Sequence, residues 1–161
     1  MKRHHVVFFT ALLILVLASC GSAGQSDGPP QIRYGEDVCD QCNMIISEPR
    51  FAAAYYTEGS ETRRFDDIGE MFLYARDSGD AVRSYWVHDF HSESWLEADG
   101  ATFVHDPDLA TPMGWGIAAF SEADEAQAYG EQHGDVLTFS ELEERVLSGE
   151  LMPEGMARHD H

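Results

Sequence analysis

The sequence predicts an α+β fold made of two related halves that share a core, each with the order strand, strand, helix, strand. Three observations lead to this prediction. Short runs rich in aromatic and β-branched residues are typical of strands. Each pair of runs is followed by a segment with apolar residues at helical spacing, and this order recurs along the chain. With 161 residues, the chain has room for one domain or for two small halves around a common core.

In the first half, residues 51–57 and 61–65 flank a Gly-containing turn, which predicts a β-hairpin. Asp66-Asp67 supplies an N-cap for the helix that follows, and the helix ends near Gly79. A strand at 83–88 completes this half because of its aromatic and β-branched content. The helix is predicted from four apolar residues: Ile68, Met71, Phe72 and Ala75.

The second half repeats these elements. Ser121 is predicted to cap a helix at 122–132. A capping box of Ser140 and Glu143 is predicted to open a last helix, which ends at Leu147. The predicted strands of this half are residues 101–105, 116–120 and 136–139.

The start of the chain is predicted to be an export signal. A basic beginning precedes the apolar run Val6–Leu17, which is about a dozen residues long, whereas a membrane-spanning helix needs roughly 20. Small residues then precede Cys20, as in a bacterial lipobox, in which the cysteine becomes the lipidated first residue of the mature protein. An ordinary signal peptide cleaved near Cys20 is the alternative. We therefore expect a lipoprotein signal peptide at 1–19 and a lipid-anchored protein on the cell membrane or outer membrane, facing the periplasm.

Composition divides the rest of the chain. Residues 20–31 are rich in Gly, Ser and Pro, which predicts a flexible tether. The folded domain is expected at 32–148, with halves at about 32–90 and 100–148, and a tail follows at 149–161.

The net charge excludes some partners. The whole chain carries a formal charge of −19 at pH 7, and its one lysine, Lys2, lies in the predicted signal peptide. So acidic a surface repels nucleic acid and anionic lipid headgroups. We therefore expect no nucleic-acid partner and contact with the membrane through the lipid on Cys20.

The strongest candidates for metal ligands lie in the stretch Cys39-Asp40-Gln41-Cys42-Asn43-Met44. Thiolate and thioether sulfur are soft ligands, a combination that favours Cu(I) over harder divalent ions. Zinc sites instead use Cys, His and carboxylates. A structural disulfide with Met44 as core filler is the alternative, although a bridge across so short a loop would stabilise little.

Two further segments contain methionine. Pro and two glycines around Met113 predict a tight, exposed loop. If the paired halves bring this loop beside the cysteine loop, Met113 becomes a further soft ligand; otherwise it covers a neighbouring strand. The tail is either a low-affinity copper-gathering arm or an ordinary frayed terminus, and its candidate ligands are Met152, Met156, His159 and His161.

Several of these segments together resemble the NosL family of nitrous oxide reductase accessory lipoproteins. The family commonly has Gly where this chain has Asn43, and Asn tolerates a left-handed backbone better than most residues. The matching segments are the lipobox at Cys20, Cys39–Ile46, Phe65–Gly69, Tyr85–Asp89, Thr111–Gly114 and Val136–Phe139.

The resemblance implies a periplasmic Cu(I)-binding metallochaperone, not an enzyme, that delivers copper to nitrous oxide reductase together with its membrane-bound maturation machinery. It also implies two ββαβ halves similar to part of organomercurial lyase. The metal ligands implied are Cys42, Met44 and Met113, followed by Cys39 and, as a weaker candidate, His88.

The main alternative is an extracytoplasmic Cys-x-x-Cys thiol-disulfide redox lipoprotein. Such proteins place the pair at a helix N-terminus, which lowers the pKa of the first thiol. Here Pro49 follows closely and prevents a long helix, and Asp40 opposes thiolate formation. A structural or zinc-binding lipoprotein is a further alternative. The chain has no phosphate-binding glycine loop, and its one Gly-x-Ser-x-Gly match, residues 24–28, lies in the predicted tether.

Overall fold

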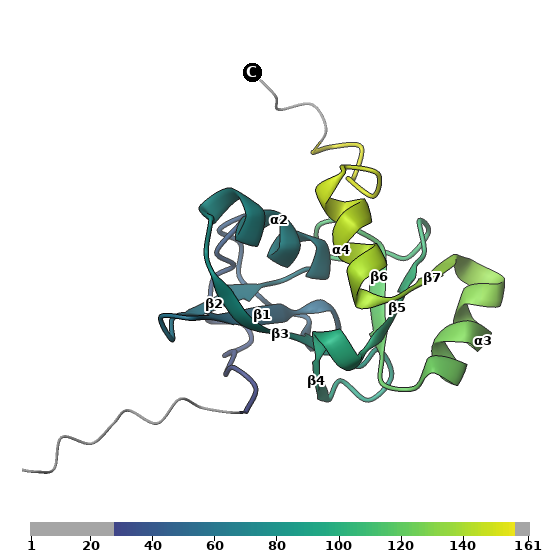
Figure 1. Ribbon diagram of the computed structural model, residues 1–161, viewed down its shortest axis with the longest axis horizontal. Helices are drawn as coiled ribbons and strands as arrows, with labels where there is room; N and C mark the ends of the chain where they lie inside the picture. Colours follow the sequence, from purple (N-terminus) through teal and green to yellow (C-terminus); the bar gives the residue numbers. More distant parts are fainter. Residues whose placement is uncertain (1–27, 157–161) are drawn as a thin grey trace, which may run out of the picture.

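The computed structural model describes residues 28–156, in which two antiparallel β-sheets are accompanied by the helices α2, α3 and α4 (Figure 1). The first half consists of β1 (Ala53–Thr57), β2 (Thr62–Phe65), α2 (Ile68–Ser78), β3 (Val82–His88) and β4 (Trp95–Glu97). The second half consists of β5 (Thr102–His105), β6 (Ile117–Phe120), α3 (Ala123–His133), β7 (Asp135–Leu137) and α4 (Phe139–Leu147).

The two halves share one topology. The sheet of the first half has the order β2-β1-β3-β4 and that of the second has the order β6-β5-β7, so in each half the first strand lies between the second and the third. Each of these pairings is antiparallel, as in Ala53 opposite Phe65 and Thr102 opposite Phe120. The predicted α+β class with a recurring ββαβ order is therefore confirmed.

Helix α4 joins the halves through a common core. It follows the second sheet in the chain but lies beside α2 of the first half (Figure 1). The Phe139 ring at its start lies 5.4 Å from the ring of Phe72 on α2 and 5.5 Å from that of Tyr85 on β3, measured between centroids. Buried residues of both halves, such as Val87 and Ile117, belong to a single hydrophobic cluster.

Helix α2 is the most deeply buried helix described. Its four predicted core residues are buried, and Gly69, Glu70 and Leu73 are buried as well. Gly79 ends the helix with φ 71°, a left-handed conformation that glycine adopts without strain. Asp67 is the N-cap residue, as predicted, but its side chain makes no capping hydrogen bond. Its carboxylate instead accepts hydrogen bonds from the loop that contains Met113.

The predicted start of α3 is wrong by one residue. Glu122 is the N-cap residue of α3, and it makes no side-chain capping bond. The backbone N–H of Ser121 instead donates to Asp89 Oδ2 at 2.9 Å. This bond ties the end of β6 to the end of β3.

The predicted start of α4 is also wrong. Strand β7 ends at Leu137, and Thr138 caps α4 in a capping box with Glu141, not Ser140 with Glu143. Thr138 and Phe139 resemble strand residues because one is β-branched and the other aromatic. Here the hydroxyl of Thr138 accepts from the backbone N–H of Glu141 at the helix start, and Phe139 packs on α2. These two interactions override the strand propensity.

Several predictions lie outside the described residues. They are the signal peptide at 1–19, the lipidation of Cys20, most of the tether, and His159 and His161 of the tail. Between residues 28 and 156, no helix is both long and apolar enough to cross a membrane.

Candidate metal centre

The cysteine loop is a short antiparallel turn held against β2. Val38 pairs with Ile45, and the N–H of Cys39 donates to the carbonyl of Met44 at 2.8 Å. Asn43 has φ 61°, a left-handed conformation, which Asn tolerates better than most residues. The carboxylate of Asp40 accepts from the backbone N–H of Arg64, at 2.7 Å, which docks the loop on β2.

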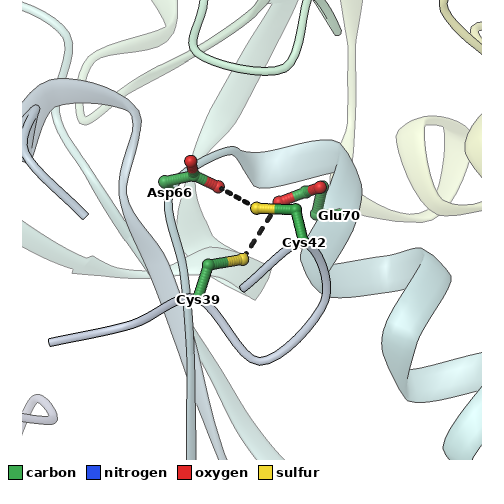
Figure 2. A group of neighbouring side chains, drawn as sticks. All are labelled: Cys39, Cys42, Asp66 and Glu70. Atoms are coloured by element: carbon green, nitrogen blue, oxygen red, sulfur yellow. Dashed lines mark hydrogen bonds between the residues drawn. The ribbon is translucent and has the colours of Figure 1, made fainter. Parts of the chain in front are cut away.

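This docking brings four side chains together: Cys39, Cys42, Asp66 and Glu70 (Figure 2). The candidate ligand atoms of the four all lie within 4.8 Å of one another. Cys39 Sγ donates to Glu70 Oε2 at 3.1 Å, and Cys42 Sγ donates to Asp66 Oδ1 at 3.5 Å. Asp66 follows β2 and Glu70 lies in the first turn of α2, so three adjoining segments supply the cluster.

The cluster is largely shielded from water. Cys39 and Glu70 are buried, and Cys42 is half-buried. Burial raises the pKa of the Cys39 thiol far above its ordinary value and that of Cys42 to about 11. Burial, with Asp66 nearby, also raises the pKa of Glu70 to about 8. Both thiols therefore carry their protons near neutral pH, and a bound metal ion would have to displace them.

Met113 reaches this region from the second half of the chain. The carboxylate of Asp67, at the start of α2, accepts from the hydroxyl of Thr111 at 2.6 Å and from the N–H of Met113 at 3.0 Å. Gly116 closes the loop with φ 62°, where a Cβ would lie 2.3 Å from the carbonyl oxygen of Asp106. Met113 and Cys42 line one cavity of about 620 Å³.

Met44 and His88 are placed differently. Met44 is 54% exposed at the rim of the cysteine loop and does not line the cavity. His88 is buried; its Nδ1 lies 2.9 Å from the carbonyl oxygen of Ala52 and its Nε2 lies 3.0 Å from the hydroxyl of Tyr34. Both ring nitrogens are thus engaged, and His88 is not part of the four-residue cluster. Burial lowers the pKa of His88, which keeps the ring neutral.

The two carboxylates of the cluster were not among the ligands expected from the sequence. A signal was available, because Asp66 and Glu70 are four residues apart at a helix start, a spacing that places two side chains on one face. Glu70 Oε1 has no hydrogen-bond partner although it is buried. A buried carboxylate oxygen of this kind requires a partner, and a cation in the cluster would supply one.

The chemistry of the donors admits two kinds of ion. Cys42 and Met113, with Cys39, offer sulfur to a soft ion such as Cu(I). Cys39 and Cys42, with Asp66 and Glu70, form a set of two thiols and two carboxylates of the kind that holds Zn(II). Both cysteines belong to both sets.

Fold and cluster together define an α+β protein with a candidate thiol-based metal site at the start of a buried helix. The sequence profile of the NosL family matches residues 32–147, which is most of the chain. The chain therefore belongs to the NosL family.

The chain also resembles two known proteins. The copper-binding lipoprotein NosL of Stutzerimonas stutzeri is 25% identical over 174 residues, which cover 98% of this chain and 92% of the relative. The crystal structure of the copper chaperone NosL from Shewanella denitrificans matches with a TM-score of 0.61. That match covers 71% of this chain and 96% of the other at 24% identity, so it bears on the fold alone.

Proposed function

We propose that this protein is a Cu(I)-binding metallochaperone that delivers copper to nitrous oxide reductase with its membrane-bound maturation machinery. We further propose that lipid on Cys20 anchors it to a membrane, facing the periplasm. Family membership supports a copper role, because both relatives described above are named for copper. The resemblance of the sequence motifs supports nitrous oxide reductase as the protein that receives the copper.

One observation carries the copper proposal. Cys42 and Met113 come from opposite halves of the chain, yet they line the same cavity. A hydrogen-bonded carboxylate at the start of α2, that of Asp67, fixes the loop on which Met113 lies. In this proposal Cys42 and Met113 hold the ion, with Cys39 behind them and Met44 at the rim.

The partial exposure of the site suits delivery. Cys42 and Met113 are half-buried, and Met44 is more exposed still. A copper donor must release its ion, and ligands on accessible loops let a recipient's ligand approach as a donor ligand leaves. A fully enclosed four-thiolate cage would retain the ion instead.

The two other functions considered are less well supported. A thiol oxidoreductase needs a thiolate at neutral pH, whereas burial raises the pKa of both Cys39 and Cys42. A zinc-binding role is favoured by one specific observation, the two carboxylates that contact the thiols. Zinc is therefore the competitor that the experiment must include.

The test is a competition of the full-length protein in detergent against a Cu(I) chelator under reducing conditions, repeated with Zn(II) present. We expect excess zinc to leave the bound Cu(I) in place and Cys42→Ser to abolish tight copper binding. Displacement of copper by equimolar zinc would show that the site is a zinc site. The apo protein should still unfold cooperatively, because a delivered ion cannot be required for folding.

A further inference from the structure

The cavity beside Cys42 is also lined by two methionines of the C-terminal segment, Met152 and Met156. We propose that these two form a second site for a soft monovalent cation, next to Met113, in which Cu(I) is held before it passes to Cys42. This inference rests on the proposed copper function and assigns a binding role to residues beyond the matched part of the family profile.

The segment that carries Met152 and Met156 forms turns after α4 at the edge of the cavity. Gly149, two residues beyond the end of α4, has φ 82° and donates its N–H to the carbonyl of Val146 at 3.0 Å. The N–H of Met152 donates to Gly149 at 3.3 Å, and that of Met156 to Pro153 at 2.9 Å. Two successive turns thus hold the segment in which Met152 and Met156 line the cavity.

The Met113 loop lies against this segment. A Cβ added at Gly114 would stand 3.8 Å from the Cβ of Pro153, an ordinary van der Waals contact. Met113, Met152 and Met156 are each half-buried and pack against the core. Three methionines therefore line one cavity together with Cys42.

The chemistry of this lining selects its ligand. Thioethers are neutral and soft, so they bind Cu(I) and Ag(I) and discriminate against Zn(II) and Mg²⁺. The charged residues of the lining are Glu70, Arg76 and Asp77. Arg76 is paired with Asp77 at 2.7 Å and donates to the carbonyl of Leu147, so its charge is compensated.

The chemistry of the ligands predicts which of the two sites binds Cu(I) more tightly. A thioether gives up no proton and carries no charge, so an all-thioether site holds Cu(I) more weakly than a site that includes the Cys42 thiolate. An ion in the thioether site can then pass to Cys42 inside one cavity without returning to water. Binding at Cys42 releases the thiol proton to solvent, and the oxidation state of copper does not change.

The experiment uses the full-length chain in detergent, with ¹³C-labelled methionine methyl groups and Ag(I) as a stable, diamagnetic substitute for Cu(I). In the wild type we expect two equivalents to bind, and the second to shift the methyl signals of Met152 and Met156. In Cys42→Ser these two signals should shift with the first equivalent. Met152→Leu/Met156→Leu should bind one equivalent, and Met71→Leu, a buried core control, should bind two.

The outcomes separate this inference from the proposed function. If the wild type binds one equivalent and the methyl signals of Met152 and Met156 stay in place, the second site is refuted and the copper function stands. If the leucine double variant still binds two equivalents, the methionines are apolar packing and the inference is wrong. If the wild type binds no Ag(I), both fail.

Discussion

The two halves of the molecule have the same order of elements but differ at the start of the helix. Between β2 and α2 lie Asp66 and Asp67, both buried; between β6 and α3 lie Ser121 and Glu122, both exposed. The third residue of each helix is a glutamate. Glu70 of α2 is 1% exposed, whereas Glu125 of α3 is an exposed surface residue.

The difference comes from what covers each helix. The cysteine loop and the loop of Met113 both contact the start of α2. The β1–β2 turn spans residues 58–61, whereas the β5–β6 connection spans 106–116 and is long enough to reach across to the other half. The repeat thus provides a scaffold, and two loops added to it convert one helix start into a candidate metal centre.

The largest effect expected from breaking this arrangement is that of Gly69→Ala on α2. The new Cβ would lie 2.0–2.4 Å from the indole ring of Trp115, which is fully buried. We expect the free energy of unfolding to fall by about 3 kcal/mol, the upper part of the range for overpacking. Urea unfolding measures this loss.

Gly130→Ala on α3 is the matched control. Its Cβ would lie 2.4 Å from a methyl group of the half-buried Val136, which can rotate away. Alanine also favours the helix over glycine by ~1 kcal/mol, so we expect a net change within about 1 kcal/mol. Equal losses in the two variants would contradict the difference in coverage between the helices.

The next effect concerns the buried carboxylate that holds the Met113 loop. Burial raises the pKa of Asp67 to about 6, so its protonated form is favoured in the folded protein. The stabilisation associated with that proton is fully present below the unfolded pKa and is lost as the pH rises through about 6. It amounts to at most about 3 kcal/mol, because the unfolded pKa is roughly 3.9.

Asp67→Asn removes this titration and retains an acceptor oxygen for Thr111 and Met113. Between about pH 4 and pH 7, the stability of the wild type relative to the variant should therefore fall as the pH rises. Urea unfolding of both proteins across this range is the measurement. A difference that stays constant with pH would mean that Asp67 titrates normally in the folded state.

A smaller effect distinguishes Zn(II) from Cu(I) as the ion bound at the site. Glu70→Gln removes a carboxylate that a zinc ion would use and a Cu(I) ion would not. We expect Zn(II) affinity to fall by at least about tenfold, the lower end of the loss when a partner of a metal ligand is removed, and Cu(I) affinity to stay the same. Glu125→Gln, at the same position of α3, should change neither. A parallel loss of copper affinity in Glu70→Gln would place the carboxylate in the copper site.

Local patterns were sufficient to predict most of the fold. The apolar spacing of α2 and the hairpin before it needed no information beyond neighbouring residues. The capping box was misplaced because Thr138-x-x-Glu141 and Ser140-x-x-Glu143 fit the same pattern, and the packing of Phe139 on α2 decides between them. Such a tertiary contact cannot be read from the local sequence.

The candidate site was predicted less completely, for the same reason. Cys39 and Cys42 are evident from their spacing, and Met113 from the composition of its loop. Asp66 and Glu70 are acidic residues in an acidic chain, and their burial depends on loops that come from elsewhere in the sequence. The double hydrogen bonding of the His88 ring likewise depends on Tyr34 and Ala52, which are distant in the chain.

The most direct test of the account asks whether both halves contribute to one copper site. Met113→Leu keeps the side-chain volume and removes the sulfur, so the free energy of unfolding should change by less than ~1.5 kcal/mol. We predict that its Cu(I) affinity, measured by chelator competition, falls by at least about tenfold. Met71→Leu, in the core of α2, should bind Cu(I) as the wild type does. If the two variants have the same Cu(I) affinity, Met113 is not a ligand and the site shared between the two halves does not exist.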